Sequence, residues 1–149
     1  MSGQSQILFY ESQHYYLSNF SAFAVRVRRE TWMTVEHAYQ ARKFPIGIAL
    51  SARQSIFRAM SAHDAKQIAK TNKHLVRAGW DEIKLKVMEE LIRLKFDQHE
   101  FVRKMLLSTG DAELVEDSPK DSFWGRGPDW KGQNHLGRLW MKIRDEMQK

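Results

Sequence analysis

Residues 34–44, Thr34-Val-Glu-His-Ala-Tyr-Gln-Ala-Arg-Lys-Phe44, contain four side chains whose types and spacing could do chemistry. At helical spacing Glu36, Gln40 and Lys43 fall on one face, and Tyr39 lies beside them. One helix would then carry a carboxylate, an amide, an ammonium and a phenol in one patch, which are the groups of a functional site. The alternative is a solvated face with an ordinary Glu–Lys ion pair.

A second segment with chemical potential is residues 118–134, which are rich in glycine, proline, aspartate and tryptophan. A planar ligand could stack on Trp124 while the carboxylate of Asp121 reaches its sugar. Loops that combine glycines with aromatic and acidic residues often carry function, because the backbone must pass close to a ligand. The alternative is a structural Ω-loop held by its own aromatic residues.

The elements that position these residues are predicted to be mostly helices. Thr34 is a suitable N-cap for the first helix, and Pro45 ends that helix at about Lys43 or Phe44. An apolar stripe of Trp80, Ile83, Val87, Leu91 and Leu94 predicts a long helix over residues 80–96. Further helices are predicted over residues 49–60, 62–70, 101–106 and 136–147, with Ser61 as an N-cap and Gly110 as a stop signal.

Short strands are predicted over residues 7–10, 23–28 and 113–116. In the second of these, Phe23, Val25 and Val27 alternate with the outward-facing Arg26 and Arg28. Residues 29–31 are predicted to form the turn that follows, and residues 72–79 and 117–131 to be irregular. The fold class is therefore mainly α (α+β): a compact single domain over residues 1–149, with about five to seven helices and a few short strands.

Composition limits the function classes. The 149 residues are 42% hydrophobic, which suits a folded domain, and contain no cysteine, which excludes disulfides and thiolate chemistry. No apolar run approaches the ~20 residues of a membrane span, and residues 1–6 lack a signal-peptide core. We expect a cytoplasmic protein that does not bind membranes. The net charge of +6 favours polyanionic partners such as nucleic acid or phosphorylated ligands.

Several motifs together resemble the NADAR family, also called YbiA-like. They occur in the family's order over nearly the whole chain, as follows: Phe9-Tyr10, Leu17-Ser-Asn-Phe20, Thr34-Val-Glu-His-Ala-Tyr-Gln40, Lys43-Phe44, Trp80 with Lys84 and Met88, Lys95-Phe96, Leu106-Leu-Ser-Thr-Gly110, Leu114-Val-Glu116, Asp121-Ser-Phe-Trp-Gly125, and Gly132-Gln-Asn-His-Leu-Gly137 to Met141 and Arg144. Family members often have glycine in the strand turn where this chain has Arg28-Arg29-Glu30, a difference that we expect to affect surface contacts rather than chemistry.

The resemblance implies a small, mainly helical hydrolase of N-glycosidic bonds. It implies two substrate classes: ADP-ribose attached to guanine in nucleic acid, removed in repair or as an antitoxin activity, which we place first, and phosphoribosylaminopyrimidine intermediates of riboflavin synthesis. The implied catalytic residues are Glu36 and Asp121. The implied substrate-binding residues are Trp80, Trp124, Asn19, Phe20, Tyr39, Lys43, Gly125 and Asn134.

Cleavage of a ribosyl C–N bond builds an oxocarbenium-like transition state, which a nearby carboxylate stabilises. One of Glu36 and Asp121 would activate water and the other would brace the ribose or the leaving group, while Trp80 and Trp124 wall the base. The sequence leaves the two carboxylate roles open. For Trp80 the alternative is an ordinary core residue at the start of its helix.

Two non-catalytic readings remain, namely a binder of ADP-ribose and a basic nucleic-acid-binding module. Arg26 and Arg28 are candidates for contacts to a nucleic-acid backbone, and Lys43, Arg126 and Lys131 for contacts to phosphate, with ordinary solubilising charge as the alternative. No cofactor is expected, and no metal, because the six histidines form no ligand pair at helical spacing. The sequence indicates no obligate protein partner.

Overall fold

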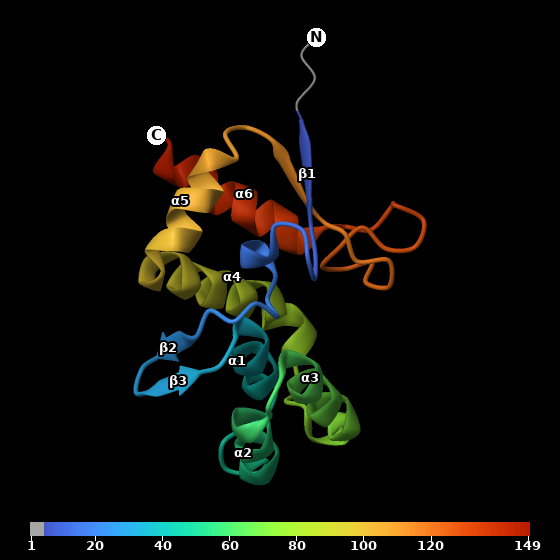
Figure 1. The fold of residues 1–149 in the computed structure, drawn as a ribbon. Coiled ribbons are helices and arrows are strands. Elements are labelled where there is room, and N and C mark those ends of the chain that lie inside the picture. The colour runs from blue at the N-terminus through green and yellow to red at the C-terminus, as the bar shows by residue number, and fades with distance from the viewer. Residues whose placement is uncertain (1–4) are drawn as a thin grey trace. The chain divides into compact units, whose positions relative to one another are not determined.

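The computed structural model of the chain describes residues 5–149 (Figure 1). Six α-helices and four short β-strands occur within these residues, in agreement with the predicted mainly helical class. The chain divides into two compact units, one formed by Asn19–Gln98 and the other by residues 5–18 with His99–Lys149. The prediction of one domain over residues 1–149 stays a prediction. The prediction that residues 1–6 lack a signal peptide falls mostly on residues 1–4, outside the described part.

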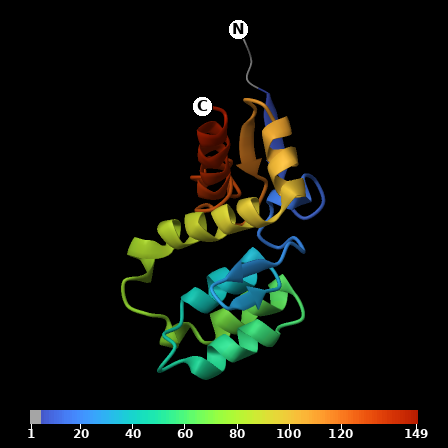
Figure 2. The same ribbon diagram turned by 90° about the vertical axis from the view of Figure 1, so that its left-hand side faces the viewer.

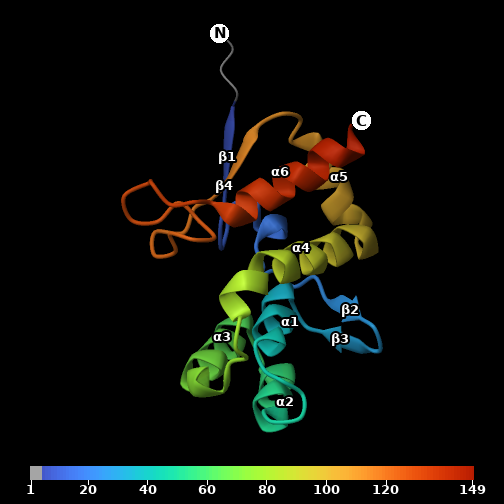
Figure 3. The same ribbon diagram turned by 180° about the vertical axis from the view of Figure 1, so that it is seen from behind.

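The unit Asn19–Gln98 is built on four helices, α1 (Val35–Arg42), α2 (Leu50–Arg58), α3 (Ala62–Thr71) and α4 (Trp80–Gln98). Helix α1 packs against each of the other three, and α2 also packs against α3 (Figure 3). Every residue from Val35 to Ala41 is buried, so α1 is the central helix of this unit.

Helix α1 begins and ends as predicted. The Thr34 hydroxyl accepts a hydrogen bond from His37 N at 3.1 Å, which satisfies a free donor of the first turn. His37 is fully buried, and its Nε2 lies 3.0 Å from the Ala59 carbonyl. Because a carbonyl only accepts, Nε2 carries the proton, and Nδ1 then accepts from the Thr34 hydroxyl at 2.8 Å. His37 therefore has a structural role.

The hairpin before α1 corrects one prediction. Strand β2 (Val25–Val27) pairs antiparallel with β3 (Glu30–Trp32), so residues 30 and 31 are strand rather than turn. Arg28 lies in the connecting loop, not on the strand, and has φ 57°. A two-residue hairpin loop twists the chain so tightly that its first position adopts positive φ, which favours glycine.

Helix α4 has the predicted location, but its buried stripe differs from the predicted one. Val87 and Leu91 are buried as expected, whereas Ile83 is 38% exposed. The buried face turns instead through Met88, Ile92 and the fully buried Lys95. The predicted stripe contained only apolar residues. It therefore left out Lys95, which faces the interior.

The second unit contains a parallel strand pair, β1 (Gln6–Phe9) and β4 (Glu113–Glu116), with Leu8 opposite Val115 (Figure 2). Helix α6 (His135–Met147) packs on β4 and also contacts α5 (Glu100–Ser108). A Cβ on Gly137 would stand 2.1 Å from the Leu114 carbonyl, so only glycine permits this close approach of α6 to β4. Trp140 Nε1 donates to the Leu17 carbonyl at 3.0 Å and fixes the other side of α6.

The segment between β4 and α6 is irregular, as predicted. Its backbone is held by many internal hydrogen bonds, including Gly132 N to Arg126 O at 2.7 Å and Leu136 N to Trp124 O at 3.1 Å. Arg126 pairs with Asp117 at 2.7 Å and stacks 3.9 Å from the centre of the Trp130 ring. The loop therefore has a defined conformation that its own contacts hold. Across residues 5–149, no helix has the length and apolar character needed to cross a membrane.

Candidate functional site

The polar face of α1 is buried, so the interpretation as an ordinary solvated face is wrong. Glu36 is 6% exposed and Gln40 is 3% exposed. Gln40 Nε2 donates to Glu36 Oε2 at 2.5 Å, one helical turn apart. A buried carboxylate is stabilised when it accepts such hydrogen bonds. The fold therefore holds the Glu36 carboxylate in a defined orientation.

Tyr39, on the same helix as this carboxylate, forms an aromatic pair with Trp80 at the start of α4. The Tyr39 ring is 5.3 Å from the Trp80 ring, tilted by 56°, and both side chains are buried. Lys43 Nζ stands 5.6 Å from the centre of the Tyr39 ring. Burial lowers the pKa of Lys43, and the charge of Glu36 partly offsets this effect. The predicted residues Glu36, Tyr39, Lys43 and Trp80 are thus brought together in one unit.

Asn19 and Phe20 belong to the same unit. The Asn19 carbonyl accepts from Glu36 N at 3.1 Å, so Asn19 adjoins the start of α1. Its side chain is buried, with Nδ2 donating to Met88 Sδ at 3.4 Å. Within residues 5–149, Asn19 Oδ1 has no hydrogen-bond partner. The Phe20 ring meets the His63 ring edge-on, with ring centres 4.7 Å apart.

The carboxylate of Asp121 organises the loop in the other unit. Its Oδ1 accepts from Phe123 N at 2.9 Å and from Trp124 N at 2.8 Å. This is an Asx turn, in which a side chain replaces a backbone acceptor. Asp121 therefore has a structural role that the sequence pattern did not indicate, and any chemical role comes in addition to it.

The remaining three loop predictions also have structural contacts. The Trp124 and Phe123 rings pack edge to face at 4.7 Å. A Cβ on Gly125 would lie 2.8 Å from Glu116 Oε2, so the loop backbone presses on the end of β4. Asn134 Oδ1 accepts from Glu116 N and its Nδ2 donates to Leu114 O, both at 2.9 Å. The substrate-binding roles of these residues stay predictions.

The ten predicted residues therefore divide between the two units, and the structure groups them within each unit. That Glu36 and Asp121 serve one substrate stays a prediction. Gln40, which spacing placed on the Glu36 face but which is not among the ten residues implied by the family resemblance, donates directly to the carboxylate. The i to i+4 spacing carried the signal for this contact.

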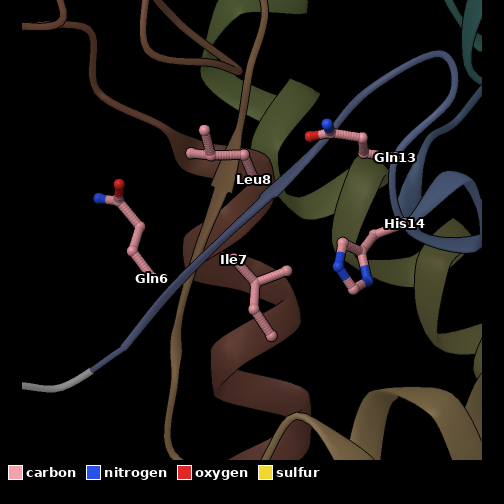
Figure 4. Close-up of a pocket in the computed structure, with 5 residues that line it drawn as sticks. All are labelled: Gln6, Ile7, Leu8, Gln13 and His14. Atoms are coloured by element: carbon pink, nitrogen blue, oxygen red, sulfur yellow. The ribbon is translucent and has the colours of Figure 1, made fainter.

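A surface cavity of about 530 Å³ lies elsewhere, along β1 and the turn after it (Figure 4). It is lined by Gln6, Ile7, Leu8, Gln13 and His14, none of which was predicted as a site residue. Among the described residues, no group of three or more His, Asp or Glu side chains could hold a metal ion. Arg126, a candidate for phosphate, is already occupied by Asp117 and Trp130.

Comparison with known proteins identifies similar chains. The family model described as the NADAR domain matches residues 8–148. The chain is 39% identical to an N-glycosidase of Nostoc punctiforme, over 87% of this chain and 83% of that protein. It is 37% identical to N-glycosidase YbiA of Escherichia coli K12, over 95% of this chain and 88% of that protein.

The solved NMR structure of E. coli YbiA superimposes with a TM-score of 0.86 at 36% identity, over 99% of this chain and 88% of that chain. A protein of Vibrio vulnificus named as a riboflavin biosynthesis protein is 37% identical over 97% of this chain, which covers 39% of that longer protein. These matches agree with the architecture found here.

Proposed function

The chain belongs to the NADAR family, and on that premise we propose that it is an N-glycoside hydrolase that cleaves the bond between a phosphorylated ribose and a base. One observation carries this proposal. The buried Glu36 carboxylate accepts a hydrogen bond of 2.5 Å from Gln40, and the same helix carries Tyr39, whose ring contacts the Trp80 ring. A hydrolase acting on N-glycosyl compounds needs such a fixed acid–base group beside a wall for the base.

The reaction requires charge stabilisation at C1′ of the ribose. As the C1′–N bond breaks, its electron pair leaves with the base nitrogen and positive charge develops on the sugar. A water oxygen bonds to C1′, one water proton passes to a carboxylate, and the base nitrogen takes up a proton. The Glu36 carboxylate is suited to accept the water proton or to stabilise the sugar cation.

The groups around Glu36 fit a flat, anionic substrate. The Tyr39 and Trp80 rings, 5.3 Å apart and tilted by 56°, would form the aromatic wall against which the base packs. Lys43 adds an ammonium within reach of the Tyr39 ring, where it can contact a phosphate.

Asp121 is proposed as the second carboxylate. Its Oδ1 is used by two backbone N–H groups, so its chemical role would fall to Oδ2. This geometry dictates the variant to use. Asp121→Asn keeps an Oδ1 acceptor for the Asx turn and removes only the charge, whereas Asp121→Ala would also remove the turn.

Two substrates are supported by different observations. The names of relatives, which include N-glycosidases and the riboflavin biosynthesis protein of V. vulnificus, favour phosphoribosylaminopyrimidine intermediates of riboflavin synthesis. The net charge of +6 favours ADP-ribose linked to guanine in nucleic acid, because a basic surface attracts a polyanion. Both substrates contain the same ribosyl C–N bond.

The test is a paired hydrolysis assay. Purified protein is offered ADP-ribosylated guanine DNA and, separately, the phosphoribosylaminopyrimidines, and released ADP-ribose or phosphoribose is quantified. Glu36→Gln should lower kcat by about 100-fold or more, the usual effect of losing an acid–base group. Glu82→Gln, which changes an exposed carboxylate on α4, is the matched control and should keep wild-type activity.

The outcomes separate the candidates. Turnover of the pyrimidine alone makes the protein a metabolite-clearing enzyme, and turnover of the DNA adduct makes it a de-ADP-ribosylating enzyme. A protein that binds ADP-ribose equally well with and without the Glu36 carboxylate, and forms no product from either substrate, is a binding module and contradicts the proposal.

A further inference from the structure

Gln40 is a buried residue whose amide is only half satisfied. Its Nε2 donates to Glu36 Oε2 at 2.5 Å. Its Oε1 is buried and has no hydrogen-bond partner among residues 5–149. The side chain is 3% exposed, in the middle of a helix that packs against α2, α3 and α4.

An unpartnered carbonyl in a protein interior is unfavourable and rare, so its presence needs a reason. Rotation of the amide by half a turn would bring Oε1 against the Glu36 carboxylate, where two acceptors repel. The orientation of Gln40 is therefore dictated by Glu36, and the orphaned oxygen is the consequence.

We propose that Gln40 is a positioning residue, whose amide fixes the Glu36 carboxylate in the orientation that hydrolysis requires. The inference rests on the proposed function and extends it to a residue that is not among the ten implied by the family resemblance. Buried polar groups without a hydrogen-bond partner are expected mainly at functional sites, where a fixed geometry is retained although it lowers stability.

The neighbouring backbone supports the same arrangement. Glu36 N donates to the Asn19 carbonyl at 3.1 Å, which fixes the first turn of α1. The main chain of Glu36 is thus set by Asn19 and its carboxylate by Gln40. A side chain held at both ends loses little freedom when a substrate binds.

The sharp test is Gln40→Glu, an almost isosteric change. At about pH 8 the introduced carboxylate faces Glu36 without a proton and repels it, so kcat should fall by about 10- to 100-fold with little change in KM. At about pH 5 the introduced group can share a proton and donate to Glu36, as the amide does, so the loss should shrink.

The charged neighbours do not alter this comparison. The charged groups that act on Lys43, at the C-cap of α1, are Glu36, Lys66 on α3, and Asp81 and Lys84 on α4, and all of them are unchanged in the variant. His37 on α1 is unchanged too. Gln54→Glu, which adds the same carboxylate to an exposed position of α2, is the matched control and should give the wild-type pH profile.

A second measurement does not depend on turnover. In wild type, the side-chain amide protons of Gln40 should show NMR shifts typical of donation to a carboxylate, and Glu36→Gln should move them back towards ordinary glutamine values. If the wild-type protein hydrolyses neither substrate but its Gln40 amide protons show these shifts, the proposed function is wrong while the hydrogen bond from Gln40 to Glu36 is confirmed. Equal loss in Gln40→Glu at both pH values, or unshifted amide protons, overturns the positioning role.

Discussion

At the scale of single residues, Lys95 has a measurable consequence for stability. It is fully buried on α4, where Nζ donates to Ser21 Oγ at 2.8 Å and stands 5.2 Å from the centre of the Phe23 ring. Burial lowers the pKa of Lys95 from 10.5 to about 7. The cause of the shift is desolvation, which disfavours the charged form.

At pH values between the folded and the unfolded pKa of Lys95, the unfolded chain therefore binds more protons than the folded chain. Stability rises with pH wherever the unfolded state holds the extra proton, so the free energy of unfolding should increase above about pH 7. From about pH 7 to pH 9 the expected gain from this lysine is about 2 kcal/mol.

Urea unfolding at a series of pH values tests this expectation. In Lys95→Met the rise should be absent, because no group at this position titrates. Lys86→Met, at an exposed position of the same helix, should keep the rise. Equal pH profiles for wild type and Lys95→Met would show that Lys95 stays charged in the folded protein.

The residue types of the site could be read from the sequence, but their environments could not. Spacing alone placed Glu36 and Gln40 on one face. It could not show that this face is covered, because burial of α1 depends on helices that follow it in the chain. The Asx turn of Asp121 was missed because residues that form such turns also suit a catalytic role.

At the scale of elements, the start of α1 depends on Thr34. Its hydroxyl accepts from His37 N and also faces His37 Nδ1. Thr34→Ala removes both interactions in a buried setting, so the free energy of unfolding should fall by about 1–2 kcal/mol. Thr34→Ser keeps the hydroxyl and should lose far less. Thermal unfolding of the two variants provides the measurement, and equal losses would show that the methyl group, not the cap, is what matters.

The β2–β3 hairpin contains a position that glycine would suit better. Arg28 has φ 57° at the first loop position, where a side chain strains the backbone. Arg28→Gly should raise the free energy of unfolding by about 0.5–1 kcal/mol. Arg29→Gly, at the next position, has no strain to relieve and should lower it slightly. A stabilisation of both variants, or of neither, would contradict this explanation.

Local signals were sufficient for most elements. Thr34, Ser61 and Gly110 mark ends of helices, and the structure has those ends near the predicted positions. Strand β3 was missed because its three residues are too few to show a period, and its identity depends on pairing with β2. The buried face of α4 was misread because a lysine points inwards there.

At the scale of the whole molecule, the salt dependence of hydrolysis should distinguish the two candidate substrates, because the protein carries a net positive charge. The chain carries +6, and the exposed Arg26 is one of the residues predicted to contact a nucleic-acid backbone. A DNA adduct contacts several phosphates and releases counterions, whereas a phosphoribosylaminopyrimidine presents a single phosphate. Added salt should therefore lower kcat/KM strongly for the DNA adduct and weakly for the phosphoribosylaminopyrimidine.

For ADP-ribosylated DNA, the logarithm of kcat/KM should fall with the logarithm of salt concentration with a slope of about −2 to −4, as for two to four phosphate contacts. For the pyrimidine the slope should be about −1 or shallower. Arg26→Gln should make the DNA slope shallower by about 1 and leave the pyrimidine slope unchanged, if Arg26 contacts a phosphate. Equal slopes for both substrates would mean that only the ribosyl phosphate is recognised, and the charge argument for nucleic acid would then be lost.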